Sequence, residues 1–181
     1  MKAIILSGGL GTRLRPLSLT TPKALLPLVN RPLIEYQLDL LDKYQIREVI
    51  FCLNYQPQLF REYFEKFKIR NSKLKIDCVV EEFPLGTGGA VKNAYRIFGI
   101  KEPVMVFNGD VLTDIDLNRI ISFHQKNKAK VTISLVRVKD PTIYGLVETD
   151  KSGRIRRFLE KPSLPIPHPS SLVPHYTINA G

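Results

Sequence analysis

The strongest constraint on the fold is a repeated pairing of a short apolar run with a segment of helical periodicity. The runs are rich in valine and isoleucine and lack polar alternation, which is typical of strands covered on both faces. The clearest helical segment follows Pro32, a residue that suits the first turn of a helix. The expected strands are residues 3–6, 49–53, 76–80 and 104–107, and the expected helices are residues 33–43, 56–67, 87–97 and 117–127.

Strand followed by helix, four times over, predicts an α/β fold with a Rossmann-like, open and mostly parallel sheet and helices on both faces. The pattern then changes to strands alone, at residues 130–138, 144–149 and 154–160. Asp150-Lys151-Ser152-Gly153 separates the last two, which predicts an added β-hairpin. Five prolines between residues 162 and 174 predict an irregular loop, and residues 176–181 open another strand.

Composition narrows the classes of function. No apolar stretch approaches the length of a membrane span, and the N-terminal run is too short for a signal peptide, so we expect a cytoplasmic protein without membrane contact. Cys52 and Cys78 lie in apolar runs without metal-ligand spacing and are expected to be buried free thiols. The net charge of +10 implies an anionic partner. Because the basic residues are not interleaved with aromatic residues, phosphorylated small molecules are favoured over nucleic acid.

A glycine-rich turn follows the first expected strand. Residues 7–16 read SGGLGTRLRP, and residues 21–23 read TPK. Three glycines within four positions let the backbone approach an anion and direct N–H groups at it, while Arg13 and Lys23 add positive charge. Neither a dinucleotide fingerprint nor a Walker loop fits these spacings. The alternative interpretation is a tight strand-to-helix turn with solvated basic residues.

Acidic residues follow the third and fourth expected strands. Residues 81–90 read EEFPLGTGGA, and residues 108–110 read NGD. The carboxyl ends of parallel strands share one edge, so we expect these segments and the glycine-rich turn on the same rim. A carboxylate at the tip of a strand suits Mg²⁺, which favours Asp110; a helix-capping role suits Asp114 or Asp116 better. The glutamates at 81 and 82 also fit a solvated acidic pair.

These motifs together resemble those of the sugar-phosphate nucleotidyltransferase family. Gly-Gly-x-Gly-Thr-Arg-Leu followed about ten residues later by Pro-Lys is its opening motif, and the similarity extends over residues 2–181. Four of the motifs together are most similar to those of mannose-1-phosphate guanylyltransferases: Glu-Glu, Pro-Leu-Gly-Thr, Asn-Gly-Asp and Asn-Ala-Gly. The other matching strings are YGLV at residues 144–147, FLEKP at 158–162 and INAG at 178–181.

The resemblance implies an enzyme that joins a sugar 1-phosphate to a nucleoside triphosphate and releases pyrophosphate, with Mg²⁺ as cofactor. The implied nucleotide-binding residues are Leu6, Gly8, Gly9, Gly11, Thr12, Arg13, Lys23, Glu81, Pro84, Gly86, Thr87, Asn108 and Gly109. The implied catalytic residues are Arg13, Lys23, Asp110 and Lys161, with Asp110 as the metal ligand. The implied sugar-phosphate residues are Gly145, Glu160, Lys161 and Asn179.

The favoured substrates are GTP and mannose 1-phosphate. Guanine presents two adjacent donors, which a carboxylate such as Glu81 would complement, whereas uracil and thymine present one. Glucose-1-phosphate uridylyl- or thymidylyltransferase and heptose-phosphate guanylyltransferase activities are alternatives of the same class. A catalytically inactive nucleotide-binding regulatory module is an alternative of another class, and a basic nucleic-acid binder ranks last.

The resemblance also bears on domain organisation. We expect one nucleotidyltransferase domain over residues 1–181, with a nucleotide-binding part at about 1–115 and a sugar-binding part at about 116–181. The family's second metal-binding aspartate falls beyond the Asn-Ala-Gly strand, so the domain is expected to lack its C-terminal portion. Relatives assemble as dimers or larger, which adds a homo-oligomer to the expectations.

Overall fold

The computed structural model describes residues 1–70, 73–138, 145–159 and 176–179. The chain divides into two compact units, Met1–Ile115 and Asp116–Gly181. No helix in the described ranges is both long and apolar enough to cross a membrane.

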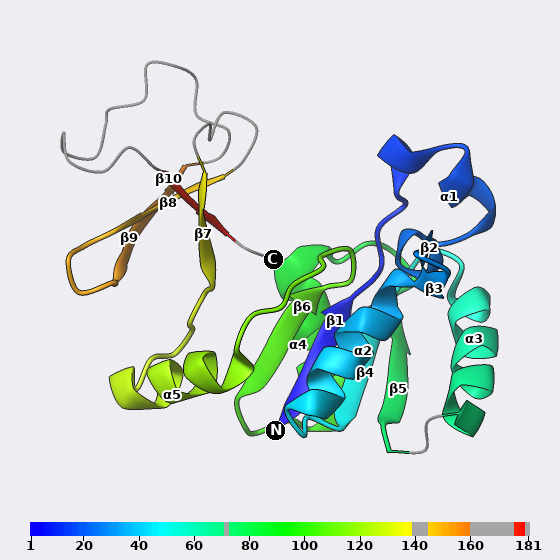
Figure 1. Cartoon of the computed structure of the whole chain (residues 1–181), viewed down its shortest axis with the longest axis horizontal. Helices are drawn as coiled ribbons and strands as arrows, with labels where there is room; N and C mark the ends of the chain where they lie inside the picture. The colour runs from blue at the N-terminus through cyan, green and yellow to red at the C-terminus, as the bar shows by residue number, and fades with distance from the viewer. Residues whose placement is uncertain (71–72, 139–144, 160–175, 180–181) are drawn as a thin grey trace. The chain divides into compact units, whose positions relative to one another are not determined.

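The first unit is built on a four-stranded sheet in the order β5-β4-β1-β6, with every neighbouring pair parallel (Figure 1). This arrangement confirms the predicted open parallel sheet, in which the first strand lies at the centre. The strands are β1 (Lys2–Leu6), β4 (Glu48–Leu53), β5 (Lys75–Val80) and β6 (Val104–Asn108). The longer helices of this unit are α2 (Leu33–Lys43), α3 (Pro57–Arg70) and α4 (Gly86–Phe98).

Short elements fill the connection between β1 and α2. They are η1 (Thr12–Leu14), α1 (Leu17–Thr20), η2 (Lys23–Leu25), β2 (Pro27–Leu28) and β3 (Arg31–Pro32). The last two pair as a two-stranded antiparallel ribbon. The chain therefore makes a long excursion after β1 before its first full helix begins, and the glycine-rich turn lies at the start of that excursion.

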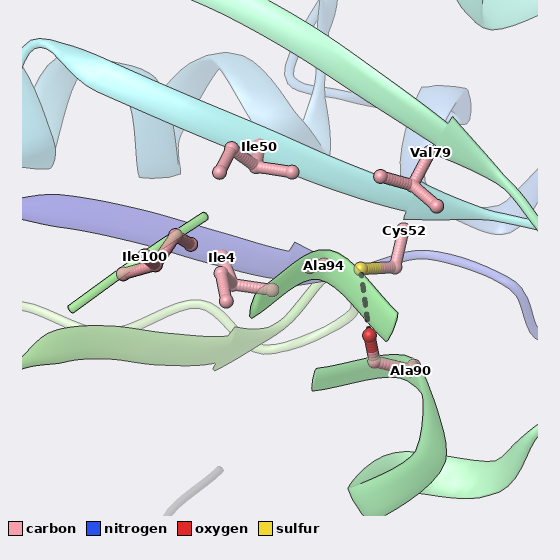
Figure 2. Packing of buried hydrophobic residues seen from close by; sticks show 7 residues of the cluster. All are labelled: Ile4, Ile50, Cys52, Val79, Ala90, Ala94 and Ile100. Atoms are coloured by element: carbon pink, nitrogen blue, oxygen red, sulfur yellow. Dashed lines mark hydrogen bonds between the residues drawn. The ribbon is translucent and has the colours of Figure 1, made fainter. Parts of the chain in front are cut away.

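Helices cover both faces of the parallel sheet, as predicted. On one face, β-strand side chains pack with α4 in a cluster that consists of Ile4, Ile50, Cys52, Val79, Ala90, Ala94 and Ile100 (Figure 2). On the other face, Phe51 packs against Phe60 and Phe64 of α3, with ring centroids 6.4 and 4.6 Å away. The alternation along β4 directs successive side chains into two separate layers.

The two cysteines are free thiols, as predicted, although only Cys52 is fully buried and Cys78 is half-buried. The Cys52 thiol lies 3.7 Å from the Ala90 carbonyl oxygen (Figure 2). Burial raises the pKa of Cys52 to about 12 and that of Cys78 to about 11. Both thiols are therefore protonated at neutral pH and belong to the core rather than to a reactive site.

Several expected element boundaries differ from the observed ones, and two of these differences have a local cause. The helix expected from Gln56 begins at Pro57, because Gln56 has a φ of 46° and cannot continue a right-handed helix. The strand expected over residues 130–138 is confined to β7 (Leu135–Val138). Its partner is the four-residue strand β10 (Tyr176–Asn179), so only four residues of β7 find a ladder.

The second unit contains α5 (Leu117–Asn127) and an antiparallel sheet in the order β7-β10-β8-β9. β8 (Leu146–Thr149) and β9 (Ile155–Leu159) form the predicted hairpin. In its turn, the Asp150 carboxylate accepts hydrogen bonds from the Ser152 hydroxyl and the Arg154 N–H, which help to lower its pKa to about 2. Asp116 is the N-cap of α5, because its side chain accepts from the Arg119 N–H, and it is one of the two aspartates that the sequence offered for this role.

We expect Phe51→Ala to lower the free energy of unfolding by about 3–5 kcal/mol, because it empties a fully buried aromatic position. Urea denaturation followed by circular dichroism measures this change. Phe83→Ala is the control, since Phe83 is 64% exposed and its loss should cost less than about 0.5 kcal/mol. Equal shifts in the two variants would contradict the assigned core.

Candidate active site

A cavity of about 370 Å³ opens at the carboxyl ends of β1 and β6. This volume lies within the range of about 300–1,000 Å³ that is usual for small-molecule sites. The loop after β1, the two 3₁₀ turns and the end of β6 all contribute to its wall, so the cavity belongs wholly to the first unit. The lining residues are Leu6, Ser7, Gly9, Gly11, Thr12, Arg13, Leu14, Lys23, Ala24, Asn108, Gly109 and Asp110.

Most of the nucleotide-binding residues predicted from the glycine-rich turn and from the Asn-Gly-Asp motif thus line one cavity. Gly8 is an exception within the glycine-rich turn, because it packs against Asn54, whose Cβ would lie 3.3 Å from an added Gly8 Cβ. The neighbouring backbone remains available to a ligand. No hydrogen bond from the N–H groups of residues 8–11 to any described residue occurs in the structure, which leaves them free to bind an anion.

Gly11 fixes the course of the turn. Its φ of 60° is in the left-handed region, and an added Cβ would lie 3.2 Å from the Ser18 Cβ and 3.3 Å from the Lys23 Cβ. The buried Ser18 hydroxyl donates to the Gly11 carbonyl at 2.8 Å. Tyr55 in turn donates its hydroxyl to the carbonyls of Ser18 and Leu19, at 3.0 and 3.2 Å. The turn is therefore held by side chains from outside its own motif.

Three charged side chains face the cavity. Arg13 and Lys23 are cationic, and Asp110 is anionic. The Lys23 Nζ lies 2.6 Å from the Asp110 Oδ2, although the two residues are 87 positions apart. With side chains that are 36% and 45% exposed, this is a surface ion pair, and such pairs contribute only about 0–1 kcal/mol. The pair can therefore open at little cost when a ligand competes for either partner.

Asp110 occupies a tight turn that leaves β6. The Val111 N–H donates to the Asn108 carbonyl at 3.3 Å, so Gly109 and Asp110 are the central residues of the turn. The Gly109 N–H donates to the Leu6 carbonyl at 2.8 Å, which binds the turn to the end of β1. An added Cβ on Gly109 would lie 2.9 Å from the Leu6 carbonyl oxygen and would overlap the Ser7 hydroxyl, so only glycine fits at this close approach.

The segment that follows β5 does not line this cavity. Glu81 is buried, and its carboxylate accepts the Leu85 N–H at 3.1 Å, while its own carbonyl accepts from the Asn54 side chain at 2.9 Å. This bonding orders the loop before α4, where Gly86 has a φ of 69°. Pro84, Gly86 and Thr87 are exposed there. β4 separates β5 from β1 in the sheet, which explains why this segment is displaced from the cavity.

The predicted sugar-phosphate residues fall in the second unit. Gly145 precedes β8, and Asn179 ends β10 opposite Leu135 of β7. Glu160 and Lys161 lie outside the described residues.

The donor set of the cavity fits one kind of metal site. Within the described parts of the chain, no three histidine, cysteine or acidic side chains gather as an all-protein cage. Asp110 is the acidic residue that lines the cavity, so the cavity offers a metal ion one carboxylate. Mg²⁺ is commonly held by one or two carboxylates, with phosphate oxygens and water as its other ligands, so the site fits a magnesium ion that arrives with a phosphorylated ligand.

The family model for nucleotidyl transferases matches residues 2–181. The chain belongs to the nucleotidyl transferase family. Mannose-1-phosphate guanylyltransferase of Mycobacterium tuberculosis is 41% identical over 179 residues, which are 99% of this chain and 47% of that protein. Mannose-1-phosphate guanylyltransferase 1 of Arabidopsis thaliana is 38% identical over 167 residues, 91% of this chain and 46% of that protein. The chain thus spans about half the length of the curated relatives it matches.

A solved nucleotide complex has the same fold. The crystal structure of HddC from Yersinia pseudotuberculosis complexed with GMP-PN superposes with a TM-score of 0.73 and 28% identity, covering 99% of this nucleotidyl transferase chain and 73% of that one. The match supports the overall fold of the chain.

Sequence reasoning missed several residues of the site. Ser7, Leu14 and Ala24 line the cavity, and Ser18, Gln37 and Tyr55 hold its loops through backbone carbonyls. Leu14 ends the glycine-rich motif but was assigned no role, and Ala24 belongs to no motif. The hydroxyl and amide groups could have been noticed as polar residues within apolar or loop segments, but no spacing indicates which carbonyl each one binds.

We expect Gly109→Ala to destabilise the chain by about 1–3 kcal/mol, because the added methyl overlaps the Ser7 hydroxyl and the Leu6 carbonyl. Gly88→Ala in α4 is the matched control. Nothing lies within 4 Å of its added Cβ, so it should stabilise by about 0.4–1 kcal/mol. Urea denaturation measures the change in the free energy of unfolding, which should fall for Gly109→Ala and rise for Gly88→Ala. An unchanged free energy of unfolding in Gly109→Ala would show that the turn does not press against β1.

Proposed function

We propose that the chain binds a nucleoside triphosphate in the cavity between β1 and β6 and acts in joining it to a sugar 1-phosphate with release of pyrophosphate. The observation that carries the proposal is the convergence of Arg13, Lys23 and Asp110 with unpaired N–H groups of a glycine-rich turn on one cavity. Family membership supports the reaction class.

The chemistry requires no nucleophile from the protein. An oxygen of the sugar phosphate is already anionic, and it attacks the α-phosphorus of the nucleotide. A new oxygen–phosphorus bond forms as the bond to the bridging oxygen breaks, and pyrophosphate leaves with that bond's electron pair. The protein's task is to bring two polyanions together and to stabilise the charge on the leaving group.

The side chains at the cavity supply that charge compensation. The Arg13 guanidinium and the glycine-turn N–H groups bind the triphosphate, and Lys23 stabilises the leaving pyrophosphate. Asp110 would hold a Mg²⁺ ion, whose positive charge would offset that of the phosphates. Because the Lys23 ammonium group lies 2.6 Å from the Asp110 Oδ2, it would compete with a metal ion for this carboxylate. Substrate binding then transfers Lys23 from Asp110 to the phosphates.

GTP and mannose 1-phosphate are the proposed substrates. Two relatives with about 40% identity are named mannose-1-phosphate guanylyltransferases, and a related solved chain holds GMP-PN. Glu81 is proposed to read guanine on the strength of the motif match alone, because its buried carboxylate accepts the Leu85 N–H and lies outside the cavity lining. Lys161, Glu160, Gly145 and Asn179 are proposed to bind the sugar phosphate, on the strength of the motif match.

We expect Arg13→Ala and Lys23→Ala each to reduce turnover by about a hundredfold or more, because each removes a preorganised charge from the cavity. Pyrophosphate release with GTP, mannose 1-phosphate and Mg²⁺ measures the rate. Arg15→Ala is the control, since this exposed arginine lies in the same segment but outside the cavity lining and should retain the wild-type rate. Unfolding midpoints of all three variants should match the wild type. Full activity of Lys23→Ala would remove the central role of that residue.

Base preference is tested with GTP, ATP, UTP and dTTP in the same assay. We expect GTP to give the highest kcat/KM, because guanine alone presents two adjacent donors to a carboxylate. Faster turnover with UTP or dTTP would show that Glu81 does not read guanine. Binding of nucleotide without turnover under any condition would instead favour the regulatory module.

A further inference from the structure

Gln37 connects helix α2 to the turn that carries Asp110. It lies in the middle of α2, is only 2% exposed, and belongs to no nucleotide motif. Its side-chain nitrogen Nε2 donates to the Asn108 carbonyl at 2.8 Å and to the Val111 carbonyl at 2.6 Å. Asn108 and Val111 are the first and last residues of the Asp110 turn, so one amide group holds both ends of it.

The orientation of this amide follows from its surroundings. With the nitrogen toward the turn, both of its protons meet carbonyl oxygens. With the amide reversed, the Gln37 oxygen would face two carbonyl oxygens and repel them. The observed orientation leaves the buried Oε1 without a donor among the described residues. An unsatisfied buried acceptor is energetically unfavourable, so the two bonds to the turn are retained at a cost in stability.

The turn needs this support because its own hydrogen bonding is weak. The Val111 N–H to Asn108 carbonyl bond is 3.3 Å long, and the other backbone anchor is the single Gly109 bond to Leu6 at 2.8 Å. Among the described residues, the Asp110 side chain bonds to Lys23, a partner that would compete with a cation for the carboxylate. When a cation binds, the position of the Asp110 carboxylate therefore depends on the backbone of the turn that carries it.

We infer that Gln37 is a positioning residue for the Asp110 carboxylate, and that it sets the affinity of the site for a divalent cation without touching the cation or the nucleotide. This inference rests on the proposed function, since it assigns Asp110 the metal. Groups that orient a metal ligand from behind commonly change metal affinity by about 10–100-fold when removed.

The test compares Gln37→Met with the wild-type chain. Methionine has nearly the same length and volume but cannot donate to either carbonyl. The probe is Mn²⁺ in the presence of saturating GTP, with free Mn²⁺ measured by electron paramagnetic resonance. We expect the Mn²⁺ dissociation constant of Gln37→Met to rise about tenfold or more, while GTP binding in EDTA stays unchanged. A purely structural role would not separate these two affinities.

Two further variants keep the test decisive. Gln37→Glu has the same shape but turns a carboxylate oxygen toward the turn, so it should weaken Mn²⁺ binding even if the methionine variant does not fold. Glu35→Gln is the matched control on the same helix. Its carboxylate is buried and pairs with Arg31 at 3.0 Å, remote in sequence from the Asp110 turn, so the variant should lose stability but keep Mn²⁺ affinity.

Wild-type Mn²⁺ affinity in both Gln37 variants would overturn the inference, as would an equal loss of metal-free GTP binding and Mn²⁺ binding. A wild-type chain that binds GTP in EDTA but no Mn²⁺ at Asp110 would overturn the metal assignment and the inference with it. A wild-type chain that binds neither would overturn the proposed function itself. Failure of the metal assignment and failure of the proposed function are therefore distinguished by measurements on the wild-type chain alone.

Discussion

The parallel pairing of β1 with β6 is the constraint on which the rest of the site depends. In that register Leu6 lies opposite Asn108, so both strands end at the same level and their loops leave the sheet side by side. The bond from the Gly109 N–H to the Leu6 carbonyl extends the ladder one step beyond the strands. A cationic, glycine-rich loop and an acidic turn, about a hundred residues apart in sequence, are thereby placed around one cavity.

Charge balance in that cavity follows from this placement. The segment that follows β1 brings the positive charges of Arg13 and Lys23 to the cavity, and the adjacent turn brings the Asp110 carboxylate. The ion pair between Lys23 and Asp110 is the result. Its two partners are also the residues that the proposed reaction requires, so binding a polyanion and a cation together replaces one ion pair by two. Neither ligand alone satisfies both partners.

Much of this architecture could be predicted from sequence because its signals are local. The helix that starts after Pro32 and the helix capped by Asp116 have the expected bounds, since each is marked by a residue at its own start. The glycine motif likewise identified its cavity. The supports of the site could not be predicted, because they join a side chain to a distant carbonyl: Gln37 reaches 71 positions to Asn108, and Tyr55 reaches 37 positions back to Ser18. Any residue has a carbonyl, so such a bond leaves no pattern in the partner's sequence.

The segment around α1 is held through its main-chain carbonyls, and this affects how its side chains can evolve. Tyr55 and Gln56 hold this segment by the carbonyls of Ser18 and Leu19, so its course does not depend on the identity of the side chains it displays. Leu17 and Leu19 are 62% and 52% exposed. Selection can therefore change the side chains of this outer surface, and with them the molecules that it contacts, while the backbone that lines the cavity keeps its shape.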